Sequence, residues 1–278
     1  MVSTTSTHRS DRVAVHRARL APYVEPHLAR RRAGVAHPVH DFLFTYYSFS
    51  PAKLLDWQPG WPSSGSPALL AKRRPLIRST LALLRATATR APTLGCFGLH
   101  EWAMVHRADR TRHPVPLRLG GTGTDEVVES HRIGCSHFDA FRFFTPSAEP
   151  LNALRPGPDD RAAYEQPGCL HATMDLYRHA FRLSPLVGSG LVADCFELAW
   201  DVRIVDMRAA PYDLTGTRLD PTGEPWTAIK IETPEGKQEY VAHQRAFAER
   251  AQPLRAELIR HCERLARDSS APGDRSSE

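Results

Sequence analysis

The sequence lacks any apolar run approaching the roughly 18 residues that a membrane-spanning helix requires. Its first ten residues are polar and contain no apolar core of the kind that signal peptides have. From these two absences we expect a cytoplasmic protein with no membrane partner. Low-complexity linkers and internal repeats are also missing from the sequence, so we expect one principal folded unit.

Cysteine is scarce, and several catalytic motifs are absent. The five cysteines are an odd number, are widely spaced and include no Cys-x-x-Cys, which argues against a disulfide framework or a zinc ribbon. The sequence has no His-Glu-x-x-His of zinc proteases, no Walker phosphate loop and no Gly-x-Ser-x-Gly. It also lacks the paired motifs of the zinc deaminases. These absences exclude the enzyme classes that are easiest to identify from a sequence.

The composition is otherwise that of an ordinary globular protein. The chain has 278 residues, of which 41% are hydrophobic and 24% are charged. Its formal net charge is +5, which permits a polyanionic partner such as DNA but does not require one. Proline is frequent, with 23 residues, and we expect many of these prolines to interrupt helices.

Apolar periodicity predicts a mainly α fold, formed by a single helical domain with a minor β element. The two clearest helices are expected at 169–183 and 190–208, where apolar residues recur at helical spacing. A short strand is expected from Ala228 to Glu232. Further helices are expected at 40–47, 51–57, 69–89, 99–107, from Thr124 to 131, from Thr233-Pro234 to about 250, and from Pro253 to about 267.

The two ends of the chain differ from the middle. Residues 1–36 contain seven arginines and form a basic N-terminal arm, which we expect to start without structure and to be interrupted at Pro22 and Pro26. We also expect this arm to be dispensable for folding and to hold phosphates if the partner is DNA. The helical domain is expected at 37–267, followed by a disordered tail at 268–278.

Five short segments repeat a mixture of histidine, cysteine and carboxylate. We therefore predict that all five segments converge on one cavity. The members of these segments are His37, His40 and Asp41; Cys96, His100 and Glu101; His131, Cys135, His137 and Asp139; Cys169, His171 and Asp175; and Asp194, Cys195 and Glu197.

The histidines in these segments suggest a metal centre. His37, His40, His137 and His171, together with Asp41, Asp139 or Asp175, could form a non-haem site on facing helices. Two histidines and one carboxylate suit iron, and similar sets suit zinc. This interpretation predicts a metal-dependent enzyme that acts on a small molecule. A binding protein without catalysis remains a third hypothesis.

A second interpretation comes from longer phrases of the sequence. The phrases HPVHDFLFTYYSFSP, LGCFGLHEWAM, CSHFDAFRFFTP, EQPGCLHATMDLY, DCFELA and DMRAAPYDL resemble those of an actinobacterial protein family commonly labelled 3-methyladenine DNA glycosylase. The resemblance extends from about residue 37 to about residue 262. It implies a DNA N-glycosylase that removes alkylated purines, a hydrolase of DNA repair.

Glycosylase chemistry would need aromatic side chains and a carboxylate. The enzyme extrudes the damaged nucleotide, stacks its base and stabilises an oxocarbenium-like sugar. Glu101, Asp139 or Asp175 could supply the carboxylate. The candidate substrate-binding residues are Tyr46, Tyr47, Trp102 and Arg178, the last of which shares a helical stripe with His171 and Asp175.

Overall fold

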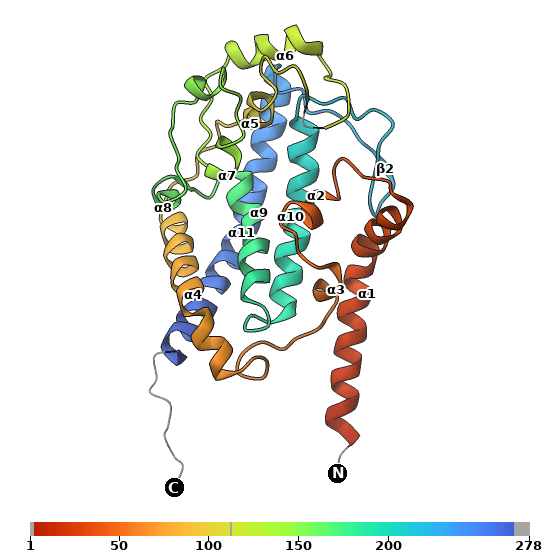
Figure 1. Cartoon of the computed structure of the whole chain (residues 1–278), viewed down its shortest axis with the longest axis vertical. Helices are drawn as coiled ribbons and strands as arrows, with labels where there is room; N and C mark the ends of the chain where they lie inside the picture. The colour runs from red at the N-terminus through yellow and green to blue at the C-terminus, as the bar shows by residue number, and fades with distance from the viewer. Residues whose placement is uncertain (1–2, 112, 270–278) are drawn as a thin grey trace.

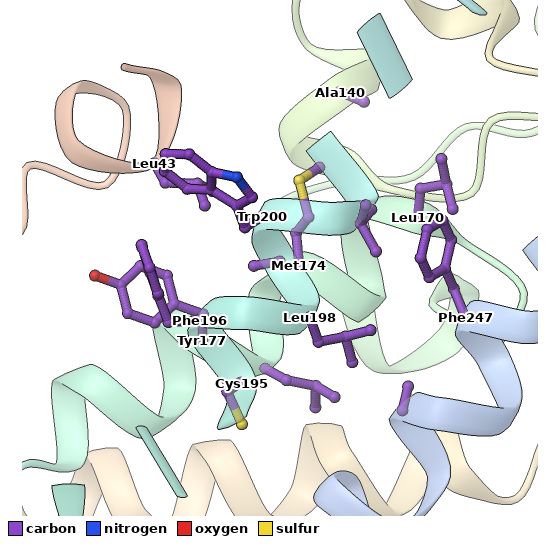
Figure 2. Close-up of a cluster of buried hydrophobic side chains, with 14 of the residues drawn as sticks. Leu43, Ala140, Leu170, Met174, Tyr177, Cys195, Phe196, Leu198, Trp200 and Phe247 are labelled. Carbon is purple, nitrogen blue, oxygen red and sulfur yellow. The ribbon is translucent and has the colours of Figure 1, made fainter. Parts of the chain in front are cut away.

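Helices α9 (Leu170–Leu183) and α10 (Ser189–Ala209) lie at the centre of the fold (Figure 1). They belong to a computed structural model that describes residues 3–111 and 113–269. Leu170, Met174 and Tyr177 of the predicted apolar stripe are buried on α9. They face a cluster that includes Cys195, Phe196 and Leu198 of α10 (Figure 2). Both central helices were therefore predicted correctly from their apolar spacing.

Three long helices surround this pair. Helix α11 (Pro234–Asp268) packs against α4 (Pro67–Ala88) on one side, and both contact α9. Helix α1 (Ser3–Ala33) packs against α10 on the other side (Figure 1). Ser66 and Thr233 start α4 and α11 because their side chains accept hydrogen bonds from backbone N–H groups three residues later. A proline at the first helical position follows each of them.

Shorter elements connect the long helices and carry part of the site. They are α2 (Phe42–Thr45), α3 (Pro51–Leu54), α5 (Leu99–Ala103), α6 (Gly120–Glu129), α7 (Phe138–Phe141), η1 (Glu149–Leu151) and α8 (Arg161–Tyr164). The prediction that Thr124 caps a helix is wrong. Helix α6 begins at Gly120, and the Thr124 hydroxyl donates to the Gly120 carbonyl from within it.

The minor β element is present, but at another place in the chain. Strands β1 (Arg218–Leu219) and β2 (Glu224–Pro225) form a two-stranded antiparallel sheet. The predicted strand from Ala228 to Glu232 is not formed. Ile229 is buried there, and its N–H donates to the carbonyl of Arg208 at the end of α10, so the segment pairs with a helix end and not with a strand.

Prolines do not interrupt the long helices where the sequence suggested they would. Pro22 and Pro26 lie within α1, Pro75 within α4 and Pro253 within α11. The carbonyl that each proline leaves without a helical partner belongs to the residue four positions earlier, at 18, 22, 71 or 249, and all four residues are exposed. Water can therefore satisfy these carbonyls, and burial of the opposite helix face offsets the cost of the lost bond.

The N-terminal segment is a structural helix and not an unstructured arm. Leu20 and Val24 are fully buried in the main apolar cluster. The buried His16 ring bonds to the carbonyl of Leu54 through Nε2. At the other end, α11 extends to Asp268, while residues 270–278 of the predicted tail lie outside the described residues.

Within residues 3–111 and 113–269, no helix combines the length and the apolar character that crossing a bilayer demands.

The burial of α1 predicts that its apolar face stabilises the whole fold. Leu20→Ala should lower the free energy of unfolding by about 2–5 kcal/mol, because it leaves a cavity in the core. Val15→Ala on the same helix is a matched control, since Val15 is 70% exposed, and it should change stability by less than about 0.5 kcal/mol. Urea unfolding of both variants measures the difference. Equal stability of the two would mean that α1 does not contribute to the core.

Candidate active site

The loop before α5 fixes two polar side chains against the central helices. Gly98 caps α5 at φ +72°, and a side chain there would come within 3.2 Å of the Cβ of Ala209. The backbone therefore approaches the end of α10 more closely than most residues would allow. His100 and Glu101 follow in the first turn of α5, and both are buried.

His100, His171 and Asp206 meet at one point, and we call them the central group. Their ligand-type atoms, one from each residue, all lie within 4.8 Å of one another. His100 Nε2 donates to Asp206 Oδ1 over 3.0 Å, and the rings of His100 and His171 meet edge to face at 4.6 Å between centroids. These residues come from α5, α9 and α10, so the group depends on the packing of all three helices.

The two histidines of the central group differ in charge. Burial alone would lower the pKa of His100, but the Asp206 carboxylate outweighs burial and raises it well above its usual value. Burial and the charge of His100 lower the pKa of His171 well below its usual value. His171 is therefore neutral. Its side chain makes no hydrogen bond to any residue in the described parts of the chain, so a nitrogen lone pair is available.

Arg203 neutralises the carboxylates around the central group. Its Nη1 donates to Asp206 Oδ2 over 2.7 Å and to Glu101 Oε1 over 3.1 Å. The guanidinium also lies 4.1 Å from the centroid of the Phe42 ring, which is a cation–π contact. Arg203 is 1% exposed. It thus holds one oxygen of Asp206 and leaves the other oxygen facing His100.

A pocket of about 270 Å³ opens beside the central group, and we call it the site pocket. Its wall contains four of the predicted site residues, Tyr46, Glu101, Asp139 and His171, together with Arg203. Three of the five predicted segments therefore converge here, namely those at 96–101, 131–139 and 169–175. The pocket gives a small molecule direct access to His171.

Asp175 lies behind this wall in a dense ion-pair network. It accepts hydrogen bonds from Tyr47 Oη at 2.8 Å, Arg161 Nη2 at 2.7 Å and Arg178 Nη1 at 3.3 Å, and His137 Nε2 lies 3.4 Å away. Burial alone would raise the pKa of Asp175, but His137 and the two arginines lower it well below its usual value. Asp175 is therefore a buried anion whose partners are already assigned.

A second pocket of about 350 Å³ adjoins the site pocket through Tyr46 and Asp139, and we call it the arginine pocket. Arg142, Arg178 and Arg182 line it, against the single carboxylate of Asp139. Arg178 donates to Asp139 over 2.6 Å. Arg182 has no ion-pair partner among residues 3–111 and 113–269. The lining is therefore net positive and suits an anionic group.

His37 and His40 form a group of their own with Asp220, away from the linings of the site and arginine pockets. His37 Nδ1 accepts from two backbone N–H groups, and its Nε2 donates to the Arg218 carbonyl. His40 Nε2 accepts from the backbone N–H of Asp220, and its ring stacks on Trp200 at 4.3 Å. Burial lowers the pKa of His40 to about 3. Backbone groups therefore already occupy three of the four ring nitrogens.

Other predicted residues serve the structure. Trp102 is fully buried, and its Nε1 donates to the Ala209 carbonyl over 2.8 Å, so it lines neither pocket. Asp194 and Glu197 pair with Arg19 of α1 close to the surface. The prediction that all five segments form one cavity is therefore wrong for the first and the fifth.

Sequence reasoning missed three members of the site, Arg161, Arg203 and Asp206. The last two lie on α10, which is buried on nearly all sides. An apolar stripe was identified on one face of this helix only. Its other faces also carry Val192, Phe196 and Trp200, and a helix that is apolar all round is a buried one. Charged residues within such a helix require partners, and that signal could have identified Arg203 and Asp206.

The Asp175 network predicts a large loss of stability when its charge is removed. Asp175→Asn leaves Arg161 and Arg178 without their central anion and should lower the free energy of unfolding by about 3–5 kcal/mol. Asp201→Asn is the control, because Asp201 pairs with Arg250 where both side chains are about half exposed. That variant should cost less than about 1 kcal/mol. Urea unfolding at pH 7 measures both, and equal costs would contradict the assignment.

The same network predicts how the stability lost in Asp175→Asn depends on pH. The pKa of Asp175 in the folded protein lies below the value of about 3.9 for an unfolded aspartate. Its charge therefore stabilises the fold above about pH 4, and this contribution is lost as the pH falls further. The stability difference between the wild type and Asp175→Asn should narrow when unfolding is measured at pH 3 instead of pH 7. A constant difference would show that Asp175 acts without its charge.

Comparisons with known proteins add no family to this description. The chain matches no protein-family model, no curated protein and no solved structure.

Proposed function

We propose that this protein is a metal-dependent enzyme that acts on a small anionic molecule. One observation carries the proposal: two histidines and one carboxylate meet within 4.8 Å beside a pocket that one of the histidines lines. Two histidines and a carboxylate with open positions are the usual ligands of non-haem iron, and three-ligand sites of this kind also hold catalytic zinc.

The contacts of the central group agree with metal binding. Arg203 bonds to Asp206 Oδ2, so Oδ1 is left to ligate. Asp206 Oδ1 and His100 Nε2 are 3.0 Å apart, which is a reasonable separation for two ligands that each lie about 2.0–2.2 Å from one ion. A metal would replace the proton between these atoms. His171 is neutral and offers a free lone pair.

The neighbouring charges indicate the class of substrate. The arginine pocket is net positive and is joined to the site pocket by Tyr46 and Asp139. An anionic group could bind to Arg142 and Arg182 while the reacting part of the molecule lies beside His171. The metal would polarise that part or activate a bound water.

The free thiols of the described cysteines support a reducing, cytoplasmic location.

Metal analysis of protein purified without an affinity tag tests the proposal. After loading with Zn²⁺, or with Fe²⁺ under anaerobic conditions, the wild type should retain about one ion per chain. His171→Ala and Asp206→Asn should lose it, because a three-ligand site has no ligand to spare. His37→Ala is the matched control, since His37 belongs to the other histidine group, and it should retain the metal.

The comparison is valid only for folded variants, so far-UV circular dichroism and thermal unfolding should accompany it. Retention of the ion by a folded His171→Ala variant would contradict the proposed ligands. So would loss of the ion in His37→Ala alone.

A second candidate is the DNA N-glycosylase that the sequence resemblance implies. The observation in its favour is the combination of arginines with Tyr46, Tyr47 and Phe49 in the arginine pocket. Arginines can hold a phosphate, and aromatic rings can stack a base. Glu101 and Asp139 are the carboxylates that reach the site pocket, whereas Asp175 is held by its network.

The glycosylase hypothesis predicts activity without a metal. Metal-free protein should release 3-methyladenine from methylated duplex DNA in the presence of EDTA. Glu101→Gln or Asp139→Asn should reduce the rate by orders of magnitude, because the carboxylate stabilises the sugar cation. Excision by metal-free protein would reject the metal proposal. Metal-loaded protein that leaves alkylated duplexes intact would reject the glycosylase.

A further inference from the structure

A pocket of about 440 Å³ lies between α11 and residues 88–94, where α4 ends and the following loop begins. Its volume falls in the range of about 300–1,000 Å³ that small-molecule sites occupy. Apolar side chains such as Leu94 and Ile259 form much of its wall. Its lining shares no residue with the site pocket or the arginine pocket.

Arg255 of α11 lines this pocket and has an unusual environment. The residue is only 3% exposed. Its Nε and Nη2 atoms are shielded from water and have no hydrogen-bond partner within residues 3–111 and 113–269. Burial lowers the pKa of Arg255 below its usual value, but a guanidinium remains charged in proteins. An unpaired buried cation of this kind is costly, so a partner for it is expected.

The surrounding charges do not provide that partner. Glu165 attracts Arg255, but its carboxylate is bonded to Arg161. The pocket is lined by Arg90 and Arg245 as well, against the one exposed carboxylate of Glu249. Arg90 is held in place by the carbonyls of Ala86 and Glu165. The lining is thus apolar with a net positive charge.

We propose that this pocket is a second binding site, which takes a carboxylate with an apolar tail. The carboxylate would pair with the Arg255 guanidinium from the pocket side, where Nη1 is not among the shielded atoms, through a charge-assisted hydrogen bond. The tail would occupy the apolar part of the wall beside Leu94 and Ile259. This assignment is independent of the metal site.

Binding of decanoate to the full chain tests this site. Isothermal titration calorimetry and thermal unfolding should show binding and an increase in melting temperature with decanoate. Acetate has the charge without the tail, and 1-decanol has the tail without the charge. Both should bind at least tenfold more weakly. If acetate bound as tightly as decanoate, only a surface arginine would be involved. If 1-decanol bound as tightly as decanoate, Arg255 would not take part in binding.

Variants locate the binding at Arg255. Arg255→Met should lower the affinity for decanoate at least tenfold. Without ligand, the variant should have a melting temperature no lower than that of the wild type, because the substitution removes an unpaired buried charge. Arg260→Met on the exposed face of the same helix is the matched control and should bind normally. Unchanged binding in Arg255→Met would overturn the proposal.

Ala256→Phe provides an independent check, because Ala256 lines the pocket and a larger side chain would fill it while Arg255 is kept. This variant should also fail to bind decanoate. If Arg255→Met does not fold, the binding measured with Ala256→Phe tests the proposal in its place. Normal binding in Ala256→Phe would place the ligand elsewhere. His171→Ala should bind decanoate as the wild type does, so failure at the metal site and failure here can be told apart.

Discussion

The pairing of Arg203 with Asp206 and Glu101 is the interaction on which the site depends. Arg203 and Asp206 lie inside α10, a helix with almost no exposed face. A buried cation and its anions are stable only when they neutralise one another at short distance. This requirement draws α5 against the end of α10, where Trp102 also bonds to the Ala209 carbonyl. The central group is therefore placed by electrostatics within the core, and its geometry follows from packing and not from a flexible loop.

The same requirement separates structural charges from charges that are available to a ligand. Asp175 is surrounded by Arg161, Arg178 and the Tyr47 hydroxyl, and its partners are complete without any other molecule. Arg182, at the arginine pocket, and Arg255, at the pocket beside α11, have no carboxylate partner in the described parts of the chain. A protein does not gain stability from an uncompensated cation beside a cavity. Water can solvate the exposed Arg182, whereas Arg255 is buried, so it is the charge of Arg255 for which an anionic ligand is the simplest explanation.

Apolar periodicity was enough to predict the helical class and both central helices, because these helices bury a regular stripe of Leu, Val and aromatic residues. The helix interruptions predicted at prolines such as Pro22 and Pro253 were wrong, because a sequence shows the proline but not the exposure of the carbonyl four residues before it. Of the five predicted segments, three meet at the site pocket, those at 96–101, 131–139 and 169–175. Spacing alone could not show which histidines have a free ring nitrogen. His37 and His40 resemble His171 in sequence, but their ring nitrogens accept hydrogen bonds from backbone N–H groups. The partner of His40 comes from a distant segment, the loop at Asp220, and so does the Arg218 carbonyl that accepts from His37 Nε2.

The environment of His100 indicates how the central group could exchange a proton for a metal. Its Nδ1 lies 3.6 Å from the Sγ of Cys96, and its Nε2 faces Asp206. Because the pKa of His100 is raised, both nitrogens carry a proton in this state, and Nδ1–H points to the sulfur. A metal that displaced the proton on Nε2 would leave the Nδ1–H contact in place, and this contact would fix the ring orientation as the outer partners of metal-bound histidines commonly do. Burial raises the pKa of the nearby Cys135 and Cys169 thiols, so these are protonated in the metal-free protein. The ligand-type atoms that meet in the central group are two imidazole nitrogens and one carboxylate oxygen, which is the donor set of the proposed site.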